Sequence, residues 1–152
     1  MIVALTGATG FVGRAIAAAL RAEGHRVRAL VRRDVTLPGL ETARAPLVPG
    51  EALTRAVDGA DALVHCAGGG RAVTRADFLA NNLATTEALL AALDAAAAPP
   101  RRFVLISSVS AGGPEGNTPD ACADAVCRAR SAYGESKWLA ERAVHARAPA
   151  LE

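Results

Sequence analysis

The chain has 152 residues and a formal net charge of +2 at pH 7. This length fits one domain, which can bury about two-thirds of the surface that the unfolded chain exposes. Apolar residues make up 51% of the sequence and charged residues 21%, a composition that argues against intrinsic disorder. No segment concentrates basic residues between aromatic ones, so we expect no nucleic-acid partner.

The cysteines and the N-terminus indicate the compartment. Cys66, Cys122 and Cys127 are an odd number without metal-ligand spacing, so we expect free thiols or apolar fillers and no metal. Such cysteines suit a reducing, cytoplasmic location. The N-terminus has no basic segment before its apolar run, which argues against a signal peptide. No apolar run reaches the roughly 18 residues of a membrane helix, so we expect no membrane partner.

The N-terminal part is expected to begin with a strand, a helix and a second strand. Ile2–Thr6 is a short apolar run that ends at a glycine, which is typical of a buried strand. Gly13–Glu23 has apolar residues at helical spacing and is followed by a glycine, a common helix C-cap. Arg26–Val31 alternates apolar and polar residues and predicts the second strand. A short third strand is expected near Ala43–Val48, and Pro46 makes it an edge strand because proline has no N–H.

The next segments continue the alternation. Glu51–Val57 predicts a short helix and Asp61–Cys66 a strongly apolar strand. A long helix is expected to begin at Thr74, with Asp77 as its capping-box partner, and to end before the proline pair at 99–100.

The C-terminal part predicts one more strand and one more helix. Phe103–Ser107 is the fifth strand, residues 112–130 are loop-rich, and Ser131–Arg147 is the last helix. Strands that alternate with helices predict an α/β fold with a doubly wound parallel sheet. We expect the strand order 3-2-1-4-5 in a single domain over residues 1–152.

A glycine-rich turn follows the first strand. Residues 6–13 spell T-G-A-T-G-F-V-G, a G-x-x-G-x-x-G pattern that opens the first helix. Glycine allows a tight turn and a close backbone approach to a pyrophosphate, which binds at a helix N-terminus. Glycines that serve only the turn are the alternative, but the strand–turn–helix context favours dinucleotide binding. The predicted cofactor-binding residues of this turn are Gly7, Thr9, Gly10, Phe11, Val12 and Gly13.

The end of the second strand bears on the choice of cofactor. An acid at this position binds the ribose hydroxyls of NAD, whereas an arginine suits the 2′-phosphate of NADP. Arg32 comes first after the strand, so we expect NADP(H). Asp34 keeps NAD as the alternative. A third interpretation is that Arg32 and Arg33 are solvated side chains at a strand end and have no binding role.

The only tyrosine and the only lysine of the chain lie four residues apart. Tyr133 and Lys137 share one face of the predicted last helix. An ammonium beside a phenol favours the phenolate and lowers the pKa from about 10. A tyrosine in that setting can act as a general acid or base near neutral pH. A solvent-exposed pair without a function is the alternative.

These motifs resemble the N-terminal part of an extended short-chain dehydrogenase/reductase of the NAD-dependent epimerase/dehydratase family. Residues 6–13 resemble the family's T-G-x-x-G-x-x-G, and 61–67 resemble its D-x-V-x-H-x-A strand. Residues 82–86 resemble N-V-x-G-T, and 133–141 resemble Y-x-x-x-K-x-x-x-E. The resemblance implies a Rossmann-like domain that binds a nicotinamide dinucleotide.

The resemblance also implies roles for individual residues. Tyr133 would be the acid or base for the substrate hydroxyl, and Lys137 would hold the nicotinamide ribose. Ser108 would hydrogen-bond the substrate oxygen, with Ser107 and Ser110 as alternatives. These assignments predict a Ser-Tyr-Lys catalytic set.

Further cofactor contacts follow from the same resemblance. Ala67 and Gly68 would bring their backbone close to the cofactor ribose. Asn82 would tie its helix to the fourth strand, or take part in a proton relay. Pro49-Gly50-Glu51 and Ala111-Gly112-Gly113 depart from the family pattern.

We therefore expect an NADP(H)-dependent oxidoreductase that acts on a carbonyl or hydroxyl group of a small-molecule substrate. The alternatives are a nucleotide-sugar epimerase or dehydratase that uses NAD, and a non-catalytic NAD(P)-binding module. Family members continue with a C-terminal substrate-binding region, so the chain is expected to be an incomplete form, with a complete minimal protein as the alternative. The resemblance also implies a homodimer.

Overall fold

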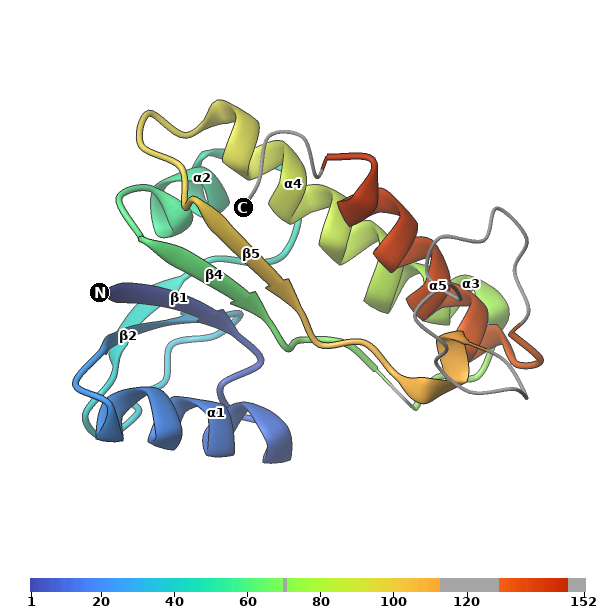
Figure 1. Cartoon of the computed structure of the whole chain (residues 1–152), viewed down its shortest axis with the longest axis horizontal. Helices are drawn as coiled ribbons and strands as arrows, with labels where there is room; N and C mark the ends of the chain where they lie inside the picture. The colour runs from blue at the N-terminus through green and yellow to red at the C-terminus, as the bar shows by residue number, and fades with distance from the viewer. Residues whose placement is uncertain (70, 113–128, 148–152) are drawn as a thin grey trace. The chain divides into compact units, whose positions relative to one another are not determined.

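A computed structural model of the chain describes residues 1–69, 71–112 and 129–147 (Figure 1). These residues form two compact units, which are described separately below. The sheet unit contains Met1–Ala67 and Ala88–Leu105, and the helical unit contains Gly68–Glu87 and the described residues of 106–150. Cys122, Cys127 and most of the predicted loop at 112–130 lie outside the described residues.

The sheet unit is built on a five-stranded parallel sheet with the order β3-β2-β1-β4-β5. This order and the doubly wound architecture confirm the prediction. β1 runs along the middle of the sheet, where Val3 lies opposite Val27 of β2 and Ala62 of β4. The strands are β1 (Ile2–Thr6), β2 (Arg26–Val31), β3 (Glu41–Arg44), β4 (Ala62–His65) and β5 (Arg102–Leu105).

Helices cover both faces of this sheet. Figure 1 shows α1 (Phe11–Ala22) on one face and α2 (Glu51–Val57) with α4 (Thr85–Ala95) on the other. All four residues of β4 are buried, as expected for a strand that is covered on both sides. The largest fully buried apolar side chains are aliphatic: Leu5, Leu53, Leu63, Leu89, Val3 and Val57.

The third strand lies earlier than the sequence pattern suggested. It spans Glu41–Arg44, so the prediction of Ala43–Val48 was wrong in all but two residues. β3 ends because Ala45 donates the last hydrogen bond to Val31 of β2 and the next residue, Pro46, has no N–H to continue the ladder. Its position at the edge of the sheet is as predicted.

The long helix predicted from Thr74 is continuous but contains a turn of another kind. α3 (Arg75–Leu79) begins with the predicted capping box between Thr74 and Asp77. A π-helical turn, η1 (Ala80–Ala84), then leads into α4. Such turns insert one extra residue and are frequent at functional sites. The helix ends at Ala95, before the proline pair.

The helical unit also contains η2, a 3₁₀ turn at Val109–Ala111, and α5 (Ala132–His145). The hydroxyl of Ser131 caps α5 by accepting a hydrogen bond from the Gly134 N–H. The helix that the sequence predicted at 131–147 is therefore present with a proper N-cap.

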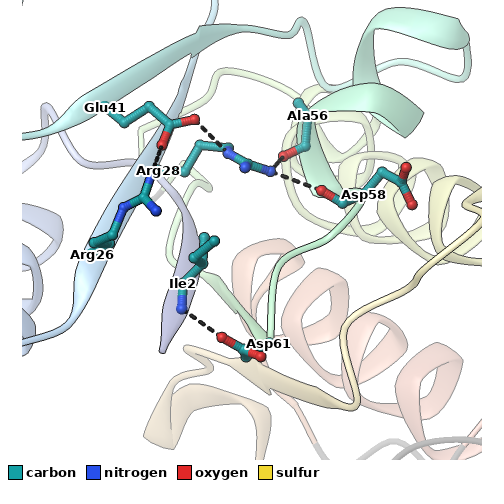
Figure 2. A network of polar contacts seen from close by, with 7 residues as sticks. All are labelled: Ile2, Arg26, Arg28, Glu41, Ala56, Asp58 and Asp61. Carbon is teal, nitrogen blue, oxygen red and sulfur yellow. Dashed lines mark hydrogen bonds and ion pairs between the residues drawn. The ribbon is translucent and has the colours of Figure 1, made fainter.

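A cluster of charged side chains holds α2 to the sheet (Figure 2). The guanidinium of Arg28 donates to Glu41 Oε1 on β3 at 2.7 Å. It also donates to the carbonyl oxygens of Ala56 and Asp58 at 3.2 and 2.8 Å. These carbonyls belong to the C-terminal end of α2, which lacks intrahelical donors. Arg28 thus joins β2, β3 and the end of α2 on the side of the sheet away from the glycine-rich turn.

Candidate functional site

The glycine-rich turn of the sheet unit is as close-packed as its sequence predicted. Gly7 has a φ of +74°, and a Cβ there would lie 2.7 Å from the backbone nitrogen of Ala67. A Cβ on Gly13 would collide with the carbonyl oxygen of Gly7. Positions 7 and 13 therefore require glycine for backbone approach, while Gly10 has an ordinary φ of −81°.

The N-terminus of α1 is open for an anion. Gly10 is its N-cap, no side chain caps the helix, and the first turn contains no acid. The first backbone N–H groups of a helix have no intrahelical acceptor and carry a partial positive charge. Phe11 is 93% exposed and Val12 48% exposed beside them. A pyrophosphate is the kind of ligand that this helix terminus can bind.

Thr6 joins the ends of β1 and β4 beneath this turn. Its buried hydroxyl oxygen accepts hydrogen bonds from the N–H groups of Cys66 and Ala67 at 3.1 and 2.9 Å. Both lone pairs are then used, so the hydroxyl proton must point to His65 Nδ1, 2.7 Å away. This arrangement fixes the backbone of Ala67, one of the predicted ribose contacts.

The end of β2 carries the charges that bear on cofactor choice. Arg32 and Arg33 are exposed. Asp34 pairs with Arg44 of β3 at 3.1 Å. A pocket of about 420 Å³ lies between these two strand ends. Sequence reasoning singled out Arg32 and Asp34 but did not pair Asp34 with Arg44, because the third strand was predicted too far along the chain.

In the helical unit, Lys137 is held at a fixed place. Its side chain is 6% exposed, and Nζ donates to the carbonyl oxygen of Ile106 at 2.7 Å. A Cβ on Gly68 would lie 3.5 Å from the same Nζ, so Gly68 leaves room beside the ammonium. Tyr133 lies one helical turn earlier and its half-buried ring contacts Phe78 of α3, with ring centres 5.9 Å apart.

Asn82 connects the loop after β4 to α5. It is 1% exposed and lies in the π-helical turn. Its side-chain amide exchanges hydrogen bonds with the backbone of Gly69 and donates to the hydroxyl of Ser136 at 3.0 Å. The Ser136 hydroxyl in turn donates to the carbonyl oxygen of Tyr133 at 2.7 Å. The predicted residues Gly68, Asn82 and Lys137 are therefore brought together, and the Ser136 hydroxyl links Asn82 to the backbone of Tyr133.

The serines after β5 differ in their surroundings. Ser108 Oγ accepts a hydrogen bond from the Ser110 N–H at 3.2 Å, which leaves its own proton available to a substrate oxygen. Ser107 Oγ is buried without a hydrogen-bond partner among the described residues. A Cβ on Gly134 would collide with the Ser110 carbonyl oxygen, so α5 packs directly against this turn. The turn that carries Ser108 and the start of α5 are thus in contact.

An ion pair fixes α5 to α3 near Tyr133. The guanidinium of Arg75 donates two hydrogen bonds to the carboxylate of Glu135, at 2.8 and 2.6 Å. The hydrogen bond with Arg75 lowers the pKa of Glu135, and the same bond raises the pKa of Arg75. The hydrogen bond from Thr74 lowers the pKa of Asp77 in the capping box at the start of α3.

Two positioning residues escaped the sequence analysis. Gly134 and Ser136 lie between Tyr133 and Lys137. The spacing of the tyrosine and the lysine does not by itself point to the residues between them. The available signal was their small size, because a helix face that packs closely against backbone favours glycine and serine.

No group of three or more His, Cys, Asp or Glu side chains in the described part of the chain could hold a metal ion. None of the described helices combines the length and apolar character needed to span a bilayer.

Comparison with known proteins shows the family of the chain. The model of the NAD dependent epimerase/dehydratase family matches residues 3–150. The chain belongs to this family. The family name agrees with the resemblance found in the motifs at 6–13 and 133–141.

The chain is similar to a reductase and to two proteins that were solved with NAD. It is 37% identical to a ceramide reductase of Caulobacter vibrioides over 97% of this chain and 43% of the relative. A short-chain dehydrogenase/reductase of Agrobacterium tumefaciens, solved with bound NAD, is 32% identical with a TM-score of 0.77 and covers 97% of this chain and 45% of its own. MoeE5, solved with UDP-glucuronic acid and NAD, is 30% identical with a TM-score of 0.78, covering 96% of this chain and 49% of its own. The chain spans less than half the length of these proteins.

Proposed function

We propose that the chain supplies the cofactor-binding and proton-transfer parts of an NAD(P)-dependent oxidoreductase that acts on a carbonyl or hydroxyl group. The observation that carries the proposal is the buried ammonium of Lys137 on the helix face of Tyr133, beside Gly68 and Asn82. Burying an ammonium is costly unless it is paired or hydrogen-bonded. Here Nζ donates a hydrogen bond to the backbone carbonyl oxygen of Ile106, which fixes the place of the charge.

The residues present fit a nicotinamide dinucleotide. Glycines at 7 and 13 leave no space for side chains, and the uncapped N-terminus of α1 offers N–H donors for a pyrophosphate. We assign Gly7, Thr9, Gly10, Phe11, Val12, Gly13 and Ala67 to this binding, with Gly68, Asn82 and Lys137 from the helical unit. The cofactor supplies the hydride when it is bound.

The chain's own residues would orient the substrate and move the proton. Tyr133 donates its phenolic proton to the carbonyl oxygen that becomes a hydroxyl, or accepts it in the reverse direction. The Lys137 ammonium binds the ribose next to the nicotinamide. Ser108 donates a hydrogen bond to the same substrate oxygen.

The cofactor preference is a separate part of the proposal. Arg32 follows β2 directly and suits the 2′-phosphate of NADP. Both solved relatives above contain NAD, which makes NAD the alternative. An epimerase or dehydratase acting on a nucleotide sugar is the second candidate function, because MoeE5 was solved with a UDP-sugar. A non-catalytic binding module, a homodimer and a cytoplasmic location stay predictions from the sequence.

The test compares cofactor binding with turnover in the same variants. Oxidation of NADPH is followed at 340 nm with a panel of ketones and aldehydes, using the protein that contains this chain at its natural length. Tyr133→Phe should keep the dissociation constant of NADPH within about twofold and lower turnover by about a hundredfold or more. Lys137→Met should weaken NADPH binding and also lower turnover. Unchanged turnover in Tyr133→Phe would contradict the proposal.

A further inference from the structure

Apolar side chains flank the proposed reacting residues of the helical unit. Val109 directly follows Ser108 as the first residue of η2 and is 72% exposed. Val73 lies in the loop that leads into α3 and is 95% exposed. The ring of Phe78 in α3 contacts the ring of Tyr133. Single exposed apolar residues need no explanation, whereas several that lie together mark a binding site.

The η2 turn and the start of α3 both pack against the first turn of α5. A Cβ on Gly134 would collide with the carbonyl oxygen of Ser110, so η2 lies directly against this turn. Arg75, at the start of α3, donates two hydrogen bonds to the carboxylate of Glu135 in the same turn. Figure 1 shows the starts of α3 and α5 together at one end of the helical unit. The two exposed valines therefore belong to segments that meet at Tyr133.

The segments around the reacting residues offer few charges to a substrate. Residues 106–112 contain no charged side chain. The carboxylate of Glu135 and the guanidinium of Arg75 bind each other through two hydrogen bonds. Arg71 is the charged residue of the loop at 68–73. A sugar linked to a diphosphate needs charge-assisted hydrogen bonds to its phosphates, whereas a hydrocarbon group needs apolar surface to leave water. The exposed valines supply the second kind of surface.

We infer that Val109 and Val73 bind the hydrocarbon part of the substrate, which is an aldehyde or ketone with an alkyl chain or apolar ring and not a nucleotide sugar. This inference rests on the proposed function and names the substrate class of the same site. Consecutive Cα atoms are about 3.8 Å apart, so a carbonyl group held by Ser108 has its neighbouring carbons near Val109. Each methylene group that leaves water on binding strengthens the binding by up to about fourfold.

Steady-state kinetics with a homologous series of aldehydes test this inference. The protein that contains this chain at its natural length is assayed with butanal, hexanal, octanal and decanal, using NADPH and NADH in separate reactions. The carbonyl carbon takes a hydride from the reduced cofactor and the oxygen takes a proton from Tyr133, which gives the primary alcohol and the oxidised cofactor. We expect kcat/KM to rise by about two- to fourfold for each added methylene group.

Variants of the two valines assign the effect to this surface. Val109→Ser should lower kcat/KM for decanal by about tenfold and that for butanal by less than about threefold, because the lost methyl groups contact the alkyl chain. Val73→Ser should also reduce the dependence on chain length, and Val109→Ile should retain it. Val48→Ser is the matched control, since Val48 is an exposed valine of the sheet unit, at 59%. This control should leave the whole series unchanged.

The outcomes distinguish this inference from the function on which it rests. Reduction of all four aldehydes without a dependence on chain length contradicts the apolar site and leaves the oxidoreductase in place. The same holds for a dependence that both serine variants leave unchanged. A Tm that falls by several degrees in Val109→Ser also contradicts the inference, because the side chain then packs against protein and not against substrate.

Two results concern the alternative and the function itself. Conversion of UDP-glucose with a KM that rises in Arg71→Met and stays unchanged in Val109→Ser assigns the substrate to the nucleotide sugars and overturns the inference. A wild-type protein that reduces no carbonyl compound, polar or apolar, with either cofactor overturns the proposed function together with the inference.

Discussion

The hydrogen bonds from Asn82 through Ser136 to Tyr133 predict a specific loss on mutation. Ser136→Ala removes the hydroxyl that accepts from Asn82 Nδ2 at 3.0 Å and donates to the Tyr133 carbonyl oxygen at 2.7 Å. Asn82 and Ser136 are 1% and 0% exposed, so water cannot replace the missing partner without rearrangement. One N–H of the Asn82 amide keeps the Gly69 carbonyl oxygen at 3.3 Å, and the other loses its acceptor.

The magnitude follows from these contacts. A buried donor without a partner costs about 1–3 kcal/mol, so we expect Ser136→Ala to lower the free energy of unfolding by about 2 kcal/mol. For a chain of this size that corresponds to a fall in Tm of roughly 4–8 °C. In an Asn82→Ala background the same substitution should cost only about 0.5 kcal/mol, because the amide that needs the hydroxyl is gone.

Urea denaturation followed by the fluorescence of Trp138, the only tryptophan, measures all four corners of this cycle. Thr86→Val is the matched control. Thr86 is 0% exposed, and its hydroxyl donates to the Asn82 backbone carbonyl oxygen at 2.7 Å. Its effect should add to that of Ser136→Ala. A Ser136→Ala variant as stable as the wild type, or strictly additive effects of Asn82→Ala and Ser136→Ala, would refute the reasoning.

Four further variants test other parts of the structure. Gly13→Ala should prevent folding, since its Cβ would collide with the Gly7 carbonyl oxygen. Gly10→Ala, whose Cβ would lie 3.3 Å from that oxygen, should lower Tm by less and weaken NADPH binding in calorimetry. Arg28→Met should lower the free energy of unfolding in urea by about 2–3 kcal/mol, because its 16% exposed side chain bonds three acceptors. Arg75 lowers the pKa of Glu135 below its usual 4.5, so the ion pair stabilises the fold above that pH and is lost as the pH falls through the lowered pKa. Glu135→Gln should therefore flatten the fall of Tm between pH 6 and 3.

Most of the sheet was predictable because four of its five strands are short runs rich in apolar residues. The bounds of β1 and β2 agree with the sequence pattern residue by residue, and the parallel order follows from the alternation with helices. β3 was misplaced because an edge strand has little apolar signal: its sequence is ETAR, and three of its four residues are exposed. Its partner strand decides its position, and a pairing is not visible in local sequence.

The residues of the candidate site were also predictable only in part. Glycine at 7 and 13 was predictable, since the turn geometry admits no other residue. The π-helical turn at 80–84 was not, because its sequence, ANNLA, has no feature that distinguishes it from an α-helix. Ser136 was not predictable either, because its hydrogen-bond partner Asn82 lies 54 residues away in the chain.

The central claim is that this chain forms a dinucleotide site, and separate titrations with NADPH and NADH test it most directly. Energy transfer from Trp138 to the reduced nicotinamide, checked by calorimetry, reports binding of each cofactor. We expect saturable binding of NADPH and of NADH, with the lower dissociation constant for NADPH. Tighter binding of NADH would overturn the cofactor preference, and no saturable binding of either up to millimolar concentration would contradict the claim itself.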